Sequence, residues 1–371
     1  MKKIVHIIGD LSIGGTERAL SSLLINLPDK QLKNYVISLS GNGYFSHEIK
    51  KAGIEVYELN FTTNLNLVKN ILKLIFTIHK IRPDILQGWM YHSNLIVSIV
   101  KFTFIRKPKV FWNIRQSLYS LQFEKKSTIY VIKILKFLSR FPDKIIFNSE
   151  IAKNHHGEFG YNTSKALVIF NGFDTNYWKF DAVKRTKIRS DYHITENDLL
   201  LGYVGRYHSV KNVELLLEVI AELSPDYPFL KAMFIGKDLV QENENFEILL
   251  NSTANNHILL LGNKSDIPGY LSAFDCFCLC SNSEAFPNVL AEAMSCNLYC
   301  ISTKVGDVPL ILDDLGDIIP PGDKERLKNA IIFWIENHIS LEENGHRGRE
   351  RIKNCFPINK NAADYASIYL S

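Results

Sequence analysis

The stretch SEAFPNVLAEAMS carries two carboxylates eight positions apart, Glu284 and Glu292. Phe286, Pro287 and Asn288 lie between them, and an apolar run that favours a helix follows. Proline is well tolerated in the first turn of a helix, and the free backbone N–H groups of a helix start attract an anion. A carboxylate accepts hydrogen bonds from paired hydroxyl groups, such as those of a ribose. The stretch could therefore hold the phosphates and sugars of a nucleotide sugar, or it could be a surface helix with two solvated acids.

Two cations, Arg206 and Lys211, stand five positions apart after an apolar run at 199–205. Arginine can bind a phosphate through two parallel hydrogen bonds, and lysine binds it as a point charge. If the run is a strand, both cations lie near its carboxyl end, where open α/β sheets bind their ligands. The pair could then neutralise a diphosphate, although surface charges are by default only solvated.

Gly14 and Gly15 open a predicted helix, and glycine allows a phosphate to approach the backbone closely. The pattern is not G-x-G-x-x-G, so it gives little support to a dinucleotide site, and a Gly-Gly pair alone is often only a turn. His92 follows a predicted strand, and this position favours a functional role over a structural one. His155 and His156 are adjacent, so they do not share a helix face, and we expect both to be exposed to solvent.

Short apolar runs alternate with amphipathic stretches, which predicts strands alternating with helices in parallel sheets. The strands expected in the first half are 3–8, 35–40, 54–59, 84–89, 109–114, 144–149 and 166–171. A polar stretch follows, and the alternation then resumes. The strands expected in the second half are 199–205, 229–236, 257–262, 275–280, 299–303 and 316–320. The sequence therefore predicts an α/β protein with two doubly wound, Rossmann-like domains.

The boundary between the domains is expected within the polar stretch 171–197. We place the first domain at 1–176 and the second at 177–357. Residues 358–371 form a further predicted helix, which could pack back on the first domain or belong to the second.

Several motifs, taken in order along the chain, resemble those of the retaining glycosyltransferases of family 4, which have the GT-B fold. The stretch from Glu284 to Glu292 resembles the Glu-x7-Glu motif of that family. The other matching segments are Gly14-Gly15-Thr16-Glu17-Arg18, WMYHSN with His92, Asn113-Ile114-Arg115, Asn171-Gly172-Phe173-Asp174, and GYVGRYHSVKN with Arg206 and Lys211. The likeness covers nearly the whole chain and implies two domains that face each other across a cleft.

The resemblance implies transfer of a sugar from a nucleotide-diphosphate donor, with UDP expected as the nucleotide and with retention of configuration. The cations and the helix-start amides would hold the diphosphate, Glu292 the ribose and Glu284 the donor sugar. The expected donor-binding residues are Gly14, Gly15, Arg206, Lys211, Lys264, Glu284, Phe286, Pro287, Asn288, Val289 and Glu292. The expected catalytic residues are His92, Glu284, Arg206 and Lys211, and those expected on the acceptor side are His92 and Arg115. The chain has no D-x-D motif, so we expect neither a metal at the diphosphate nor a cofactor.

The resemblance further implies a glycan or polyprenyl-linked acceptor in the assembly of a bacterial surface polysaccharide such as lipopolysaccharide. Two other kinds of function stay open at this point. One is a GT-B nucleotide-sugar epimerase or phosphorylase. The other is a sugar-binding subunit of a polysaccharide assembly complex that has no catalytic activity.

Charge is distributed unevenly along the 371 residues, whose net charge is +4. Residues 1–180 contain 25 Lys+Arg and 12 Asp+Glu, a balance of +13, whereas 181–371 contain 18 and 27, a balance of −9. This asymmetry suggests an anionic partner for the first half. The chain has no helix-turn-helix, zinc or RNP signature, so we expect no nucleic acid but an anionic membrane surface. The segment 125–144 combines six basic residues with apolar Ile129, Ile132, Leu135 and Leu138 at helical spacing. It could lie in a membrane interface, or it could be a helix that faces the core and whose lysines are only solvated; the net charge of the first half favours the membrane.

No stretch approaches the roughly 18 apolar residues of a membrane span, and the apolar run in MKKIVHIIGD is too short for a signal peptide. Cys276, Cys278 and Cys280 alternate with other residues as in a buried strand, and their spacing differs from that of zinc sites. We therefore expect a cytoplasmic protein that is peripheral on the inner face of the membrane.

Overall fold

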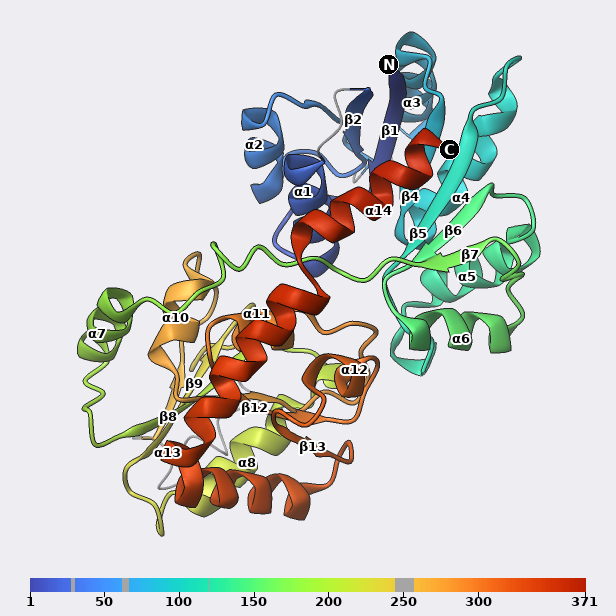
Figure 1. The fold of residues 1–371 in the computed structure, drawn as a ribbon. Coiled ribbons are helices and arrows are strands. Elements are labelled where there is room, and N and C mark those ends of the chain that lie inside the picture. The colour runs from blue at the N-terminus through green and yellow to red at the C-terminus, as the bar shows by residue number, and fades with distance from the viewer. Residues whose placement is uncertain (28–30, 62–66, 120, 244–256) are drawn as a thin grey trace. The chain divides into compact units, whose positions relative to one another are not determined.

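A computed structural model describes residues 1–27, 31–61, 67–119, 121–243 and 257–371. The chain divides into two compact units, which are coloured along the chain in Figure 1. Unit 1 contains Met1–Gly172 and Ile358–Ser371, and unit 2 contains Phe173–Pro357. Each unit has a parallel sheet with helices on both faces, as the alternation in the sequence predicts.

The sheet of unit 1 has seven parallel strands in the order β3-β2-β1-β4-β5-β6-β7. The strands are β1 (Lys2–Ile8), β2 (Leu32–Ser38), β3 (Glu55–Glu58), β4 (Ile85–Trp89), β5 (Lys109–Ile114), β6 (Lys144–Phe147) and β7 (Ala166–Val168). The order reverses between β1 and β4, so the loops after these strands diverge and leave room for a ligand at their carboxyl ends.

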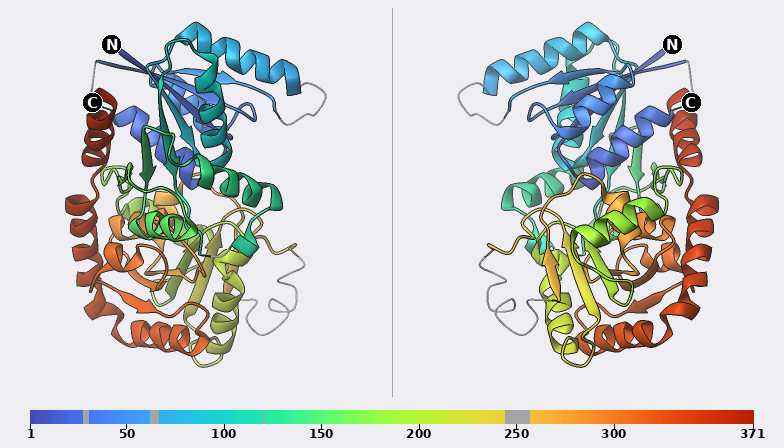
Figure 2. Two further views of the ribbon diagram at one scale, coloured as in Figure 1. Left: turned by 90° about the vertical axis from the view of Figure 1, so that its right-hand side faces the viewer. Right: turned by 90° about the vertical axis from the view of Figure 1, so that its left-hand side faces the viewer.

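The helices of unit 1 form two layers. They are α1 (Gly15–Asn26), α2 (Tyr44–Lys51), α3 (Leu67–Ile81), α4 (Met90–Val100), α5 (Lys126–Leu138), α6 (Glu150–Phe159) and α14 (Ile358–Leu370), with short 3-10 helices η2 (Lys101–Thr103) and η3 (Leu121–Phe123). Figures 1 and 2 show α1, α2 and α14 on one face of the sheet and α3, α4 and α5 on the other.

The C-terminal helix α14 belongs to the core of unit 1. Ala362, Tyr365 and Tyr369 are buried with residues of α1 and of the central strands. The Tyr369 hydroxyl donates to Gln87 Oε1 at 2.6 Å, and Asn113 Nδ2 donates to the Tyr365 hydroxyl, also at 2.6 Å. Burial of the aromatic rings and satisfaction of their hydroxyl groups together hold this helix on the unit.

The sheet of unit 2 has six parallel strands in the order β10-β9-β8-β11-β12-β13. They are β8 (Leu199–Val204), β9 (Leu230–Ile235), β10 (Ile258–Leu260), β11 (Cys276–Leu279), β12 (Tyr299–Thr303) and β13 (Asp317–Ile319). The helices are α7 (Ala182–Asp191), α8 (Val213–Leu223), α10 (Ile267–Ala273), α11 (Asn288–Ser295), α12 (Val308–Leu312) and α13 (Lys324–Cys355), with 3-10 helix η4 (Ser209–Lys211). Cys276, Cys278 and Cys280 are buried, as their alternation predicts.

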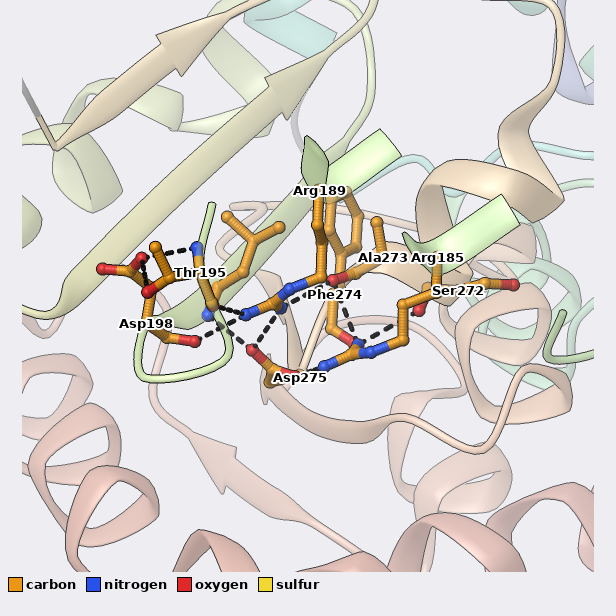
Figure 3. Close-up of polar contacts among 9 residues, drawn as sticks. Arg185, Arg189, Thr195, Asp198, Ser272, Ala273, Phe274 and Asp275 are labelled. Carbon is orange, nitrogen blue, oxygen red and sulfur yellow. Dashed lines mark hydrogen bonds and ion pairs between the residues drawn. The ribbon is translucent and has the colours of Figure 1, made fainter. Parts of the chain in front are cut away.

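Two arginines of α7 hold this helix of unit 2 against the segment before β11 (Figure 3). Asp275 accepts a hydrogen bond from Arg185 Nη2 at 2.5 Å and another from Arg189 Nη1 at 3.0 Å. Arg189, only 2% exposed, also donates to the carbonyl oxygens of Thr195 and Asp198 at 2.6 and 2.7 Å. Because each buried charge is paired, the network is a fixed support for the start of β8 and β11.

The prediction that both neighbouring histidines of α6 are exposed is wrong. His156 is buried, its Nδ1 donates to the Ala152 carbonyl at 2.7 Å, and its Nε2 lies 3.0 Å from the Tyr91 hydroxyl. His155 is half-buried, with Nδ1 2.6 Å from the hydroxyl of Ser117. Adjacent residues on a helix point about 100° apart, so one of them can face the core while its neighbour stays at the rim.

Candidate functional site

The carboxylate of Glu284 forms the centre of a polar cluster at the carboxyl ends of β8 and β11. Lys211 Nζ makes an ion pair with Glu284 Oε1, and the Ser281 hydroxyl donates to the same oxygen at 2.8 Å. Ser281 and Glu284 follow β11, whereas Lys211 ends η4 after β8. Because β8 and β11 are neighbouring strands, their loops meet, and two residues that the sequence predicts as donor ligands come together.

Backbone contacts hold these two loops against each other. The N–H group of Asn282 donates to the Val210 carbonyl at 2.7 Å. The Cys280 thiol lies 3.3 Å from the carbonyl oxygen of Lys211. These contacts between the two loops help to fix the backbone near Lys211 and Glu284, so the positions of the two residues do not depend on their ion pair alone.

The loop after β12 packs closely against the backbone of Glu284. Gly306 has φ of +51°, and a Cβ at this position would lie 2.8 Å from the Glu284 carbonyl oxygen and closer still to that of Ala285. The N–H group of Asp307 donates to the Ala285 carbonyl at 2.8 Å. Only glycine combines this backbone conformation with so close an approach. The loop after β12 therefore helps to fix the backbone position of Glu284.

Glu292 lies on the second turn of α11, which begins at Asn288 directly after Pro287. Its side chain is 3% exposed, so it is far less accessible than a solvated surface acid. Burial and then the nearby Glu292 carboxylate raise the pKa of the Cys296 thiol to about 12. The interpretation of the stretch as a surface helix with two solvated acids is therefore wrong for Glu292.

The ring of Phe286 belongs to the core of unit 2. It lies 6.2 Å from the ring of Phe173 and 5.4 Å from that of Phe356, measured between ring centroids. The side chain of Phe286 is therefore part of a packed aromatic cluster. Asn288 and Val289 are half-buried in the first turn of α11, the end of a helix whose dipole favours an anion.

Arg206 lies on the loop that leads from β8 to Lys211, whereas Lys264 follows β10, which β9 separates from β8. Arg206 is exposed and follows β8, and Lys264 is half-buried after β10. Gly236, with φ of +149°, brings the end of β9 so close to the Gly205 carbonyl that a Cβ would collide with it. This contact fixes the start of the loop that carries Arg206, although the guanidinium itself extends into solvent.

In unit 1, Gly14 is the N-cap residue of α1, and Gly15 is its first residue. The carboxylate of Glu17 folds back over Gly14, into the space that a Cβ would fill. The positive end of the helix dipole therefore already faces a carboxylate. A phosphate that approached this turn would first have to displace Glu17, which sequence reasoning did not foresee.

His92 is exposed on the first turn of α4, just after β4. Neighbouring atoms partly desolvate its ring and lower the pKa of His92. The imidazole is then neutral near pH 7 and can donate one hydrogen bond and accept another. Met90, at the junction of β4 and α4, has φ of +69°, a strained conformation of the kind that often occurs at functional sites.

Arg115 lies at the end of β5 and is held from three sides. Its guanidinium carbon is 5.5 Å from the ring centroid of Trp89, and Nη2 donates to Asn171 Oδ1. Burial lowers the pKa of Arg115, while Tyr365 and Glu17 oppose that shift. Sequence reasoning missed Tyr365, because it carries no motif and α14 reaches Arg115 only through the tertiary fold. Trp89 belongs to the WMYHSN segment, but its contact with Arg115 could not be read from that segment.

Among the residues that the structure describes, no group of three or more His, Cys, Asp or Glu side chains is placed to hold a metal ion. No helix among those residues is both long and apolar enough to cross a membrane.

Comparison with family models gives the class of this protein. The model for glycosyl transferases group 1 matches residues 184–351, and that for glycosyltransferase family 4 matches residues 13–177. The two matches together span most of the chain. The protein belongs to the group 1, family 4 glycosyltransferases, and its two Rossmann-like units are those of the GT-B fold.

Individual relatives are distant. The chain is 27% identical over 209 residues to N-acetyl-alpha-D-glucosaminyl L-malate synthase of Bacillus anthracis, a match that spans 54% of this chain and about half (52%) of that protein. It is 24% identical over 386 residues, 99% of this chain and 96% of the relative, to the Escherichia coli UDP-Gal:alpha-D-GlcNAc-diphosphoundecaprenol alpha-1,3-galactosyltransferase. The crystal structure of Anabaena HepE with UDP and glucose superimposes with a TM-score of 0.86 over all of both chains at 21% identity.

Proposed function

We propose that this glycosyltransferase transfers a hexose from a UDP-sugar, with retention and without a metal ion, to a glycan or polyprenyl-linked acceptor in bacterial surface polysaccharide assembly. The cluster of Lys211, Glu284 and Ser281 is the observation that carries the proposal. Two comparisons support the choice of ligands: HepE was crystallised with UDP and glucose, and the E. coli relative is named for a UDP-Gal donor and a diphosphoundecaprenol acceptor.

The proposed chemistry depends on charge that develops as the donor breaks down. The bond between the anomeric carbon and the diphosphate oxygen breaks, and the diphosphate gains negative charge. Lys211, Arg206 and the amides at the start of α11 would stabilise that charge most strongly in the transition state. The acceptor hydroxyl attacks the same face of the sugar and passes its proton to the departing phosphate oxygen, which preserves the configuration. No residue is assigned as a covalent nucleophile.

The remaining residues are proposed in supporting roles. Glu292 would bind the ribose hydroxyls, and Glu284 would orient the hydroxyls of the donor sugar. His92, as a neutral imidazole, and Arg115 are proposed to serve the acceptor side from unit 1. Gly14, Gly15 and Lys264 would contribute backbone contacts to the donor.

Two measurements test the enzyme assignment. A thermal-shift screen against nucleotide sugars should raise the melting temperature with a UDP-sugar, because a ligand of the native state stabilises it. UDP release should then require both donor and acceptor and should persist in excess EDTA. Turnover of the donor sugar without any acceptor would indicate an epimerase, and binding without turnover would indicate a subunit that only binds sugars.

Lys211→Ala should lower kcat/KM roughly 10²-fold, the scale of removing one donor from a site that stabilises transition-state charge. The exposed Lys187 of α7 supplies the matched control, since Lys187→Ala removes the same charge from unit 2 away from the cluster. Both variants should fold, as judged by circular dichroism and melting temperature. Near-wild-type turnover in Lys211→Ala would remove Lys211 from the site.

We further propose that unit 1 associates with an anionic membrane through α5. The apolar side chains expected to face the membrane do not all do so, because Ile132 and Leu135 are buried in the core. The exposed residues of α5 are instead Lys126, Ser127, Tyr130, Lys133, Ile134 and Phe137. Basic and aromatic side chains on one exposed helix suit the headgroup region of a bilayer.

Salt dependence tests this association. Binding to vesicles with anionic lipid should weaken steeply between 0.1 M and 1 M salt, since the Debye length falls from about 10 Å to about 3 Å. Reversal of Lys125, Lys126, Lys133 and Lys136 to Glu should abolish most binding and spare UDP binding. Equal binding to neutral and anionic vesicles at 0.1 M salt would contradict an electrostatic contact.

A further inference from the structure

Helix α3 has two apolar sides, and only one of them packs on unit 1. Leu74 and Ile78 are buried in the core, as one stripe of an amphipathic helix. Val68, Leu72 and Phe76 recur every four residues on another side, with exposed fractions of 71%, 62% and 70%. Three large apolar side chains in one stripe form a continuous surface, unlike single exposed residues, which are common.

The segment after α4 extends this surface. Phe102 in η2 is 66% exposed, and Ile105 is fully exposed. The ring of His79, in the last turns of α3, stacks on Phe104 with centroids 4.0 Å apart, and its Nε2 lies 2.9 Å from Thr103 Oγ1. These contacts fix the segment to the end of α3. We call the set Val68, Leu72, Phe76, Phe102 and Ile105 the α3 patch.

The stretch of chain that carries the α3 patch has almost only positive charges, although Glu55 of β3 lies near one of them, Lys80. Residues 59–123 contain nine Lys or Arg and a single acid, Asp84. The Asp84 carboxylate accepts a hydrogen bond from the backbone of Lys3 at 2.9 Å. The exposed cations beside the α3 patch are Lys69, Lys73, Lys80, Arg106 and Lys107. An apolar surface bordered by cations matches the interface of an anionic bilayer, where lysine stems lie along the acyl chains and their ammonium groups reach the phosphates.

The position of α3 within unit 1 supports the same partner. Helices α3, α4 and α5 cover one face of the sheet (Figure 2), and α5 exposes Tyr130 and Phe137 together with its lysines. The two helices therefore belong to the same layer of unit 1, and both expose apolar and basic side chains.

We propose that the α3 patch inserts into the boundary between headgroups and acyl chains of an anionic bilayer, as an apolar anchor beside the electrostatic contact of α5. This inference rests on the proposed association of unit 1 with a membrane, and it names the side chains that enter the lipid. Burial of apolar surface is not screened by salt, whereas attraction between exposed charges is. The α3 patch should therefore account for the binding that remains at high salt.

Fluorescence quenching tests the insertion directly. The four native tryptophans, Trp89, Trp112, Trp178 and Trp334, are buried, so a tryptophan introduced at position 102 reports on lipid contact. In Phe102→Trp, vesicles of brominated phosphatidylcholine and phosphatidylglycerol should quench part of the emission. The matched control is Phe333→Trp on α13 of unit 2, which should not be quenched. Absence of quenching in Phe102→Trp at saturating lipid would overturn the proposal.

A second experiment measures affinity. The combined variant Leu72→Ser, Phe76→Ser, Phe102→Ser and Ile105→Ser should lose at least tenfold of its binding to the same vesicles, without bromine, at 1 M salt. The control combines Val183→Ser, Phe333→Ser and Ile339→Ser, three exposed apolar residues of unit 2, and should bind like the wild type. Equal binding by the two combined variants would contradict insertion. A dimer in lipid-free solution that only the α3 patch variant disrupts would assign this surface to a second copy of the chain instead.

UDP binding by the wild type and by the α3 patch variant tests the enzyme assignment independently of membrane insertion. The α3 patch variant should bind free UDP as tightly as the wild type does, because the patch lies in unit 1 and carries no proposed donor ligand. Failure of the wild type to bind UDP would refute the proposed donor and leave the vesicle results unaffected. Failure of the vesicle experiments with intact UDP binding would refute the insertion alone.

Discussion

Lys211 and Glu284 are paired while the hydroxyl of Ser281 also holds the carboxylate, at 2.8 Å. A diphosphate that approached Lys211 would compete with Glu284 for the ammonium group. Glu284 would keep its bond to Ser281 and gain free acceptor capacity for sugar hydroxyls. Glu292 differs, because it is buried on a helix and its position is set by α11. Substitutions of the two glutamates should therefore have different effects on UDP binding and on turnover.

Glu292→Gln should mainly weaken binding of free UDP, about tenfold or more, because an amide accepts the ribose hydroxyls less strongly than a carboxylate does. Glu284→Gln should leave the affinity for free UDP nearly unchanged and should lower kcat. Isothermal titration with UDP and steady-state kinetics with the UDP-sugar measure the two effects. Equal losses of UDP affinity in both variants would refute this division of roles.

At the scale of elements, the loop that carries Glu284 is positioned by the neighbouring loop after β12. Gly306 approaches the carbonyls of Glu284 and Ala285 with a positive φ, and Asp307 donates to Ala285. The support is a backbone contact between two loops that neighbouring parallel strands bring together. A change in the supporting loop should therefore reach the site without touching a ligand.

Gly306→Ala should cost about 1–3 kcal/mol of stability, from strain at a positive φ and from the displaced carbonyls, and it should also weaken UDP-sugar turnover. Gly322→Ala is the matched control: its φ is +73°, but no atom lies within 4 Å of the position that a Cβ would take. The control should lose stability only through its backbone and keep full turnover. Denaturant unfolding and steady-state kinetics of both variants decide the matter; equal turnover would show that the loop after β12 does not position Glu284.

At the scale of the whole molecule, two buried histidines make the stability of unit 1 sensitive to acid. Unit 1 buries two neutral imidazoles: burial lowers the pKa of His6 to about 4, with Asn34 opposing the shift, and lowers the pKa of His156 to about 4 as well. Trp89 Nε1 donates to His6 Nδ1 at 3.2 Å, so protonation of that nitrogen would break the bond. Between the usual pKa of 6.5 and about 4, the unfolded chain binds these protons and the folded chain does not.

Unit 1 should therefore lose stability as pH falls from about 6.5 to about 4, by up to about 1.4 kcal/mol per pH unit for each imidazole, and should regain it above that window. His156→Gln should remove about half of the dependence, since glutamine does not titrate. The exposed His47 supplies a matched variant, because His47→Gln removes a histidine from the surface and leaves both buried imidazoles in place. Urea unfolding followed by near-ultraviolet circular dichroism at pH 4.5 to 7.5 measures the slope. A flat profile in the wild type would contradict the buried neutral imidazoles.

The sequence by itself determined the parts of this protein that depend on local pattern. Alternating apolar runs located all the strands of both sheets, and 109–114 and 299–303 are β5 and β12 to the residue. The motifs that identify the family are also local. Each is a short segment of glycines or charged residues next to a predicted strand, so it can be recognised in the sequence alone. The buried alternation of Cys276, Cys278 and Cys280 is equally local.

Only the tertiary structure decided which groups meet across the chain. Neighbouring strands bring Lys211 to Glu284 and Gly306 close to the loop that carries Glu284. Packed helices bury His156. None of these contacts follows from spacing in the sequence. The C-terminal helix α14 packs on unit 1 because its aromatic side chains fill a core some 280 residues away in sequence, where Tyr369 meets Gln87. Likewise, the apolar pattern of α3 and α5 predicts amphipathic helices, but each has apolar side chains on more than one side. Packing on the sheet decides which of them are buried and which remain exposed, since a helix can bury only the side that faces its neighbours.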